Sequence, residues 1–385
     1  MLVWFVACGP KIDVGPVPVE RWAAPVTVVT EAAPADDEIR LSAMVRAGSG
    51  FDPIGREGLA WLVAHTLADD DLETVVDTEW VTFTSACPAP EAPRCIDRFV
   101  GALTTFDPLG WEEHREQALA QPSTALDILH QVLFEGHRTG HPRPGWPSVV
   151  PSLTPDEGQR FHATHYRRST VLAGVVGSEA VASTLREALA AVPGGAPADD
   201  AWMRPPSQAG RRLFVVPREP EAPAEVVFGQ VMSIGADDPA VAGLATAMAG
   251  LEAALATADP DPPVLASATG WLTPRPETPR RSVALTGRLV PATPELTADA
   301  LALAVTTLNQ WTGTSRLPSS PPPDAAQRLA RRMAAEILPV VPPSDEAPDV
   351  LMKRLVDPSE WQFVVVGDPG DVSALGFDAV VSAEP

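Results

Sequence analysis

The stretch FDPIGREGLAWLVAHTLADDD, residues 51–71, is the most informative part of this sequence. It predicts a helix from Pro53 to about Leu67, because apolar residues follow one another there and an acidic run ends them. A potential metal ligand, His65, lies inside the apolar part. Trp61 precedes it by four residues and Ala64 by one. These three positions determine what chemistry the helix can perform, because residues four apart share a helical face.

The same three positions resemble the zinc-binding helix of inverted zincins, whose pattern is H-x-x-E-H. In that pattern two histidines bind zinc and the glutamate polarises the attacking water. Here Trp61 replaces the first histidine and Ala64 replaces the glutamate, so His65 alone is retained. One imidazole does not make a zinc site, which needs about three protein ligands plus a water. The helix therefore resembles a zinc-peptidase helix whose chemistry has been removed.

Further segments extend this resemblance in order and spacing. Residues 45–49 read VRAGS, residues 134–145 read FEGHRTGHPRPG, and residues 153–166 read LTPDEGQRFHATHY. Together with the predicted helix they resemble the insulinase and mitochondrial processing peptidase family over most of residues 20–200, and more weakly over 210–385. The resemblance implies an insulinase-like metallopeptidase fold of class α+β. Such a chain has two homologous domains, each an antiparallel-rich mixed sheet covered by helices.

The sequence divides into four parts on composition and pattern. Residues 1–20 resemble a lipoprotein signal with a tether, and residues 21–192 form the N-terminal domain with the degenerate motif. A linker rich in Pro and Gly at 193–210 precedes the C-terminal domain at 211–385. The strand that ends at Gly177 is matched, about half a chain later, by one that ends at Gly367. Each is expected to precede a helix, which indicates an internal duplication.

Hydrophobic periodicity and turn residues predict the individual elements. Strands are expected at 24–33, 38–47, 79–86, 169–177, 211–216, 225–234, 264–273, 281–290 and 361–366. Helices are expected near 94–104, 110–120, 123–135, 179–191, 238–257, 297–311 and 323–337, with a short final helix after Asp368. A further helix begins at Thr154, because Thr154, Pro155 and Glu157 form a capping-box pattern.

Three cysteines bear on the compartment of the protein. Cys8 follows an apolar run and a small residue, which resembles the acylation site of a bacterial lipoprotein; a chance apolar N-terminus is the alternative. Cys87 and Cys95 flank a Pro-rich loop and are expected to form a disulfide in an oxidising periplasm or at the cell surface. The alternative to a disulfide is that both cysteines are unpaired and pack as small apolar residues. The expected location is periplasmic and lipid-anchored, otherwise secreted or in the cell envelope.

Composition excludes some partners. The formal net charge of −22 argues against nucleic acid and anionic membranes, since both need a basic patch. We therefore expect no nucleic-acid partner, and membrane contact only through a lipid anchor. The acidity itself is explained by solubility and need not indicate an acidic site.

Other candidate site residues depend on the resemblance. The third zinc ligand of the family corresponds to Glu113 or a close neighbour, so that His65 and Glu113 would be the remnant of a metal site. The pairs His162/His165 and His137/His141 invite a different metal site, or are ordinary histidines. The family's assistant subunit holds substrate with an arginine and a tyrosine from its second half. The single tyrosine here, Tyr166, lies in the first half, while arginines occur at 280, 281 and 288.

These observations predict a catalytically inactive peptidase homologue that needs no cofactor. It would pair with an active zinc peptidase of the insulinase family and enclose peptides with it. A stand-alone periplasmic binding or scaffold lipoprotein is the alternative. A zinc metallopeptidase with displaced ligands is a third interpretation.

Overall fold

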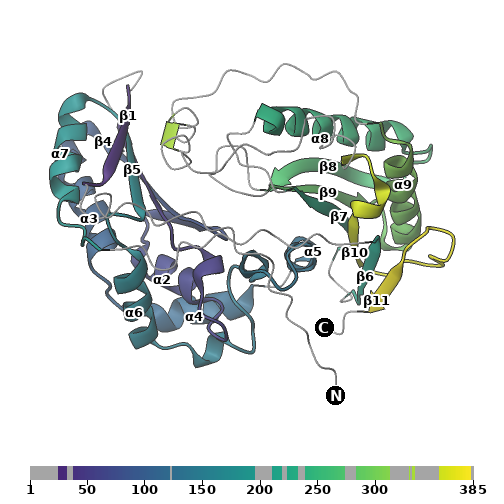
Figure 1. Ribbon diagram of the computed structural model, residues 1–385, viewed down its shortest axis with the longest axis horizontal. Coiled ribbons are helices and arrows are strands. Elements are labelled where there is room, and N and C mark those ends of the chain that lie inside the picture. The colour runs from purple at the N-terminus through teal and green to yellow at the C-terminus, as the bar shows by residue number, and fades with distance from the viewer. Residues whose placement is uncertain are drawn as a thin grey trace. The chain divides into compact units, whose positions relative to one another are not determined.

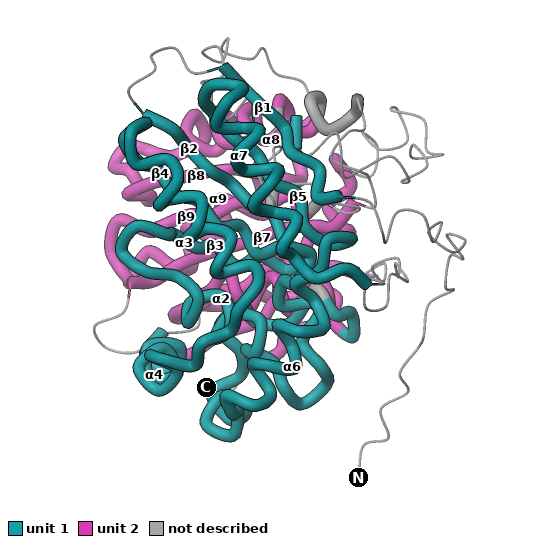
Figure 2. Tube along the Cα trace, turned by 90° about the vertical axis from the view of Figure 1, so that its left-hand side faces the viewer, with its two compact units in different colours: residues 1–122, 136–204, 322–339 teal, residues 123–135, 205–321, 340–385 magenta. Residues whose placement is uncertain are grey.

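A computed structural model describes residues 25–32, 38–121, 124–195, 210–218, 223–232, 239–273, 283–312, 329, 332–333 and 355–382. The chain forms two compact units (Figure 2). Unit 1 comprises residues 1–122, 136–204 and 322–339, and unit 2 comprises residues 123–135, 205–321 and 340–385. Each unit therefore contains a short segment from the opposite half of the sequence.

Unit 1 is built on a five-stranded mixed sheet with the order β1-β5-β2-β4-β3. Its strands are β1 (Thr27–Glu31), β2 (Glu38–Val45), β3 (Glu73–Val76), β4 (Val81–Pro88) and β5 (Val171–Val176). β1 and β5 are parallel, and all other neighbours are antiparallel. Along β4, Val81, Phe83, Ser85 and Cys87 are buried and alternate with more accessible residues, as expected for a strand with one face on the core.

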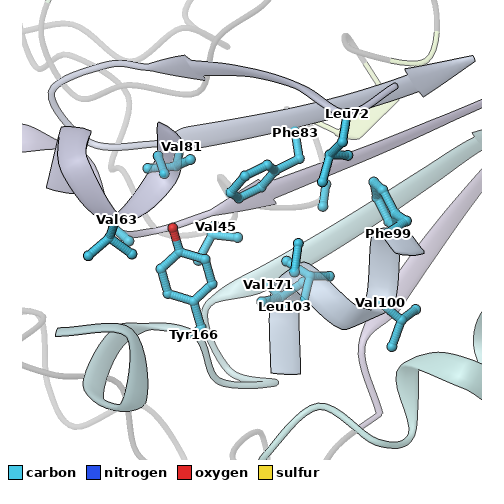
Figure 3. Close-up of a cluster of buried hydrophobic side chains, with 14 of the residues drawn as sticks. Val45, Val63, Leu72, Val81, Phe83, Phe99, Val100, Leu103, Tyr166 and Val171 are labelled. Atoms are coloured by element: carbon cyan, nitrogen blue, oxygen red, sulfur yellow. The ribbon is translucent and has the colours of Figure 1, made fainter. Parts of the chain in front are cut away.

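Helices pack on one face of this sheet (Figure 1). They are α2 (Leu59–Leu67), α3 (Ala92–Thr104), α4 (Trp111–Ala120), α6 (Pro155–His165) and α7 (Glu179–Leu189). Phe83 from the sheet, Phe99 and Leu103 from α3, and Tyr166 after α6 meet in the resulting core (Figure 3). The predicted capping box of α6 is confirmed, because Thr154 and Glu157 each accept a hydrogen bond from the other's backbone N–H.

The opposite face of this sheet is covered by residues from the second half of the sequence. Leu329 and Met333 pack there against Val29, Met44, Trp80, Leu172 and Val176. Gly174 makes room for them, since a Cβ atom at this position would lie 2.5 Å from the sulfur of Met333. The guanidinium of Arg332 donates a hydrogen bond to the backbone carbonyl of Thr30 and forms an ion pair with Glu31, so this side chain contacts strand β1.

Unit 2 repeats the strand order of unit 1 and adds one strand. Its sheet has the order β11-β6-β10-β7-β9-β8. The strands are β6 (Arg212–Val216), β7 (Glu225–Met232), β8 (Leu265–Thr273), β9 (Val283–Pro291), β10 (Gln362–Val366) and β11 (Ala379–Ser382). β6 and β10 are parallel, as β1 and β5 are, and the three following pairs are antiparallel in both sheets. The shared topology is consistent with duplication of one ancestral unit.

Three of the described helices cover the two faces of the second sheet. α8 (Pro239–Ala258) and α9 (Thr297–Gln310) share one core with Phe228 and Phe363 of the sheet. α5 (Ala125–Leu133) shares a different core with Val227 and Val364, the neighbours of those two phenylalanines. Because side chains of adjacent strand residues point to opposite faces, α5 covers the second face. A capping box between Thr124 and Asp127 begins this helix.

Six short 3-10 helices complete the described elements, at Ser49–Phe51, Ala89–Glu91, Arg138–Gly140, Val150–Ser152, Pro294–Leu296 and Pro358–Glu360. The prediction of an α+β fold with two mixed sheets covered by helices is confirmed. Residues 1–20, most of the expected linker and most of the expected helix 323–337 lie outside the described residues.

Three local expectations were wrong. The helix expected from Pro53 begins only at Leu59, because Gly55 and Gly58 have φ values of 75° and 105°, outside the right-handed helical region. The short strand β3 was not expected. The final helix after Asp368 does not form; Asp368 accepts from the amide of Gly370 in a turn, and the chain continues to β11. The duplication therefore does not extend to a helix after Gly367.

Candidate functional site

The N-terminus of α2 is held by a buried carboxylate from the preceding loop. Asp52 accepts hydrogen bonds from the amides of Gly58 and Ala60, both at 2.7 Å. Burial raises the pKa of Asp52. The two amide donors lower this pKa, and the nearby Glu57 raises it. The cap satisfies amides that would otherwise lack partners at the helix start, and so fixes where α2 begins.

The two altered motif positions face the core of unit 1. Trp61 is 5% exposed and Ala64 is completely buried. Both belong to the same hydrophobic cluster as Leu62 and Val63. The first ligand position of the zincin pattern therefore carries a packed indole, and the position of the general base carries a methyl group. Neither can bind a metal or accept a proton.

His65 is half-buried and is held from two sides. Its ring stacks on the indole of Trp61 with centroids 3.7 Å apart and an interplanar angle of 19°. Its Nδ1 lies 2.9 Å from the carbonyl oxygen of Trp61. Burial lowers the pKa of His65, and the neighbouring His114 lowers it further, while the hydrogen bond to Trp61 opposes the shift.

The residue that approaches His65 from α4 is His114. The two imidazole rings lie 6.3 Å apart. Glu113, the residue inferred from the family pattern, is exposed on α4 and accepts a hydrogen bond from Nε2 of Gln117 at 3.4 Å. The neighbouring residue His114, which the sequence did not single out, brings its ring near His65. The presence of a histidine in the same helical turn was the available signal.

The zinc site implied by the inverted-zincin pattern does not fit these residues. Trp61 and Ala64 supply neither ligand nor base, and the indole occupies the side of His65 on which the first histidine would lie. Among the described residues no group of three or more His, Cys, Asp or Glu side chains is placed to hold a metal ion.

The other histidine pairs are placed differently. His162 and His165 are both buried on α6, and burial lowers the pKa of each to about 4. Nε2 of His162 donates to the carbonyl of Ala102 at 3.2 Å, and His165 packs on Phe161. These are core histidines. His137 is buried, and Nδ1 of His141 lies 3.2 Å from the carbonyl of Ser49.

Other predicted residues concern disulfide formation, lipidation and substrate binding. Cys87 and Cys95 are joined by a disulfide with Cα atoms 6.8 Å apart, between the end of β4 and α3. Cys8 lies outside the described residues, as do the arginines at 280 and 281. Arg288 pairs with Glu225. The hydroxyl of Tyr166 is buried and has no hydrogen-bond partner among the described residues.

No helix within the described ranges is long and apolar enough to cross a membrane. No family model matches the sequence, and no curated protein matches it.

Solved structures share the fold. A structure described as the peptidase M16 inactive domain from Pseudomonas fluorescens is 16% identical, covers 90% of this chain and 96% of its own, and has a TM-score of 0.68. A chain of complex III2 from Candida albicans with Inz-5 bound is 15% identical, covers 89% and 94%, and has a TM-score of 0.63. The periplasmic protease PqqL from Escherichia coli is 12% identical with a TM-score of 0.59, and its match covers 93% of this chain but 47% of PqqL. The chain thus has the insulinase-like fold of M16 peptidase structures.

Proposed function

We propose that this chain is a catalytically inactive homologue of the insulinase-like peptidases, which binds peptides without cleaving them and pairs with an active zinc peptidase. The observation that carries the proposal is the burial of Trp61 and Ala64 in the core at the two decisive motif positions. A chain that keeps the fold while its ligand and base are replaced by core residues retains binding surfaces but no hydrolytic chemistry.

Peptide binding is supported by an open edge strand next to the degenerate helix. The turn after α2 is closed by an isolated β-bridge between Asp69 and Leu72. The chain then continues into β3, the last strand of the first sheet. Within the described residues β3 pairs with β4 alone. The side chain of Val75 on β3 is 62% exposed. An edge of this kind accepts an extended peptide as an additional strand.

The register shows which backbone groups of β3 remain available. The amide of Asp77 donates to the carbonyl of Trp80 on the β4 side. Because backbone groups alternate in direction along a strand, those of Val75 also point toward β4, whereas those of Thr74 and Val76 point away. Thr74 and Val76 thus offer two donors and two acceptors at 2-residue spacing, which matches the ladder of an extended peptide.

Removal of one outward donor tests this binding mode. Thr74→Pro deletes an N–H that the ladder to β4 does not use, so the fold tolerates it as edge strands tolerate proline. We expect peptide affinity, measured by fluorescence anisotropy with a labelled extended peptide library, to fall by about tenfold, which corresponds to about 1.4 kcal/mol for one hydrogen bond. Thr74→Ala keeps the N–H and is the matched control. Equal affinity for both variants would show that peptides do not bind along β3.

Pairing with an active subunit is the second part of the proposal. The structural match to an M16 inactive domain and to a chain of complex III2 supports it, since both carry this fold. An interface with the partner should exceed about 1,000 Å². Size-exclusion chromatography with light scattering should show a 1:1 complex with an H-x-x-E-H homologue from the same organism, and its peptidase activity should rise. If the active homologue neither binds nor changes in activity, the chain is better described as a stand-alone binding lipoprotein.

A periplasmic location with a lipid anchor at Cys8 completes the proposal. The disulfide between Cys87 and Cys95 supports an oxidising compartment, and PqqL, which shares the fold, is described as periplasmic. Metabolic labelling with a palmitate analogue tests the anchor: incorporation that Cys8→Ser abolishes supports it, and equal labelling of both proteins contradicts it.

A further inference from the structure

We infer that α5 and the pair Leu329/Met333 are two reciprocal straps, which keep the two halves of the chain associated even when the linker between them is cut. The halves are residues 1–201 and 202–385, divided inside the linker expected from the sequence. α5 comes from the first half and belongs to unit 2, whereas Leu329 and Met333 come from the second half and belong to unit 1. The inference requires neither a bound peptide nor a partner chain.

The strap from the first half covers the second face of the sheet of unit 2. Leu129 is completely buried and Leu133 is 2% exposed, and both share a cluster with Val227 and Val364. The sheet receives the two leucines at Gly229 on β7, where a Cβ atom would lie 3.3 Å from Leu129 and 3.2 Å from Leu133. Without α5 this face would expose its buried valines to water, and the cost would grow with the apolar area uncovered.

The strap from the second half covers the corresponding face of the sheet of unit 1. Leu329 and Met333 are 3% and 1% exposed, and both residues are helical. They lie four residues apart, as Leu129 and Leu133 do, and this spacing places two side chains on one helical face. Gly174 on β5 receives the pair, since a Cβ atom there would lie 2.9 Å from Leu329. Each sheet therefore has a position without a side chain beneath the strap that comes from the other half.

Each strap is also joined by an ion pair to the first strand of the unit that it covers. Arg332 pairs with Glu31 of β1 at 3.1 Å. Glu135, which follows α5, pairs with Arg212 of β6 at 3.0 Å. β1 and β6 hold the same place in the strand order that the two sheets share, so the straps are attached in the same way. Such an exchange of equivalent elements is a domain swap, here within one chain.

The linker is therefore not the connection that keeps the halves together. Separation of the halves after a cut would withdraw both straps and uncover an apolar face on each sheet at once. Two attachments between the same two bodies also act together, because each raises the effective concentration of the other.

Cleavage of the folded full-length chain tests the inference. A protease site is inserted after residue 201, and the cut protein is analysed by size-exclusion chromatography with light scattering. We expect the two fragments to elute together at the mass of the uncut chain and to separate only in denaturant. Fragments that separate in native buffer would overturn the inference.

Hydrogen exchange on the uncut chain distinguishes the straps from any other contact between the fragments. Leu129→Ala, in the first half, should accelerate amide exchange in β7 and β10 by at least about tenfold, and Met333→Ala, in the second half, should do so in β2 and β5. The matched controls are Leu185→Ala on α7, which should accelerate exchange in β2 and β5, and Leu301→Ala on α9, which should act on β7 and β10. All four side chains are at most 1% exposed, so the substitutions are comparable.

The straps thus predict a crossed pattern, in which Leu129→Ala and Met333→Ala each loosen the sheet of the opposite half while the controls loosen the sheet of their own. Acceleration confined to the mutated half in all four variants would overturn the inference, because each sheet would then be held by its own half alone.

Discussion

Acidification should destabilise unit 1 well above the pH at which carboxylates become protonated. The cause is the pair of buried histidines on α6. His162 is 5% exposed and His165 is 8% exposed, and burial lowers the pKa of each from 6.5 to about 4. In the unfolded chain both return to about 6.5. Between these values the unfolded state binds more protons than the folded state.

The sign and size of the effect follow from this difference. Stability rises with pH wherever the unfolded state binds more protons, so the contribution of these histidines is complete above pH 6.5 and is lost as pH falls toward 4. A shift of about 2.5 pH units corresponds to roughly 3–4 kcal/mol per histidine, hence roughly 7 kcal/mol for the pair. The lowered pKa of His65 adds to the trend, and the raised pKa of Asp52 opposes it.

Replacement of one histidine isolates the effect. His165→Leu keeps a similar volume between Phe51 and Phe161, whose rings lie 5.5 and 4.3 Å from the imidazole. We expect its free energy of unfolding at pH 7.5 to stay within about 1.5 kcal/mol of the parent. Between pH 6.5 and 4.5 the parent should lose about 2 kcal/mol more stability than the variant. His162 is left intact, because its removal would deprive the carbonyl of Ala102 of a donor.

Urea unfolding at pH 7.5, 6.5, 5.5 and 4.5 provides the measurement, with hydrogen exchange of the α6 amides to assign the transition to unit 1. The difference between parent and variant cancels the contributions of Asp52 and His65, which both proteins share. Parallel curves for the two proteins would refute the reasoning, because they would show that His165 is not held neutral by burial.

Three further outcomes are expected. Tyr166→Phe should leave stability unchanged or raise it by about 1 kcal/mol in thermal unfolding, since the buried hydroxyl has no partner among the described residues; a loss above about 2 kcal/mol would reveal one. Trp61→His combined with Ala64→Glu should lower the free energy of unfolding by at least about 4 kcal/mol, because a cavity and a buried carboxylate are created together; a stable double variant that cleaves peptides would contradict this. Thiol labelling of unreduced, denatured protein should find Cys87 and Cys95 blocked, and reduction should cost about 2–3 kcal/mol, whereas two free thiols would disprove the pairing.

Local patterns sufficed for the parts of the fold that depend on neighbouring residues. The capping box at Thr154 and Glu157 predicted the start of α6, since the hydrogen bonds that begin a helix are made within four residues. The replacement of ligand and base by Trp61 and Ala64 was readable for the same reason, because a motif on one helix is defined by spacing alone. The insulinase-like resemblance predicted the α+β class that the structure confirms.

Contacts between distant segments were not predictable in this way. The expected helix at 123–135 was found as α5, but its apolar face covers the sheet of unit 2, which the pattern of one segment cannot specify. β3 is four residues long, too short for its alternation to stand out before its pairing with β4 is known. After Gly367 the two halves diverge, because Asp368 and Gly370 form a turn where the first half begins a helix.

The same distinction between local sequence and tertiary packing applies to the candidate site. By itself the sequence determined that α2 carries one imidazole and no base, because composition and spacing on one helix suffice for that conclusion. Only the tertiary structure decided that His114, and not Glu113, approaches His65, since the phase of α4 against α2 depends on how Trp111 and Ala118 pack in the core. The identity of the residues is local information, whereas the juxtaposition of their side chains is a property of the packed core.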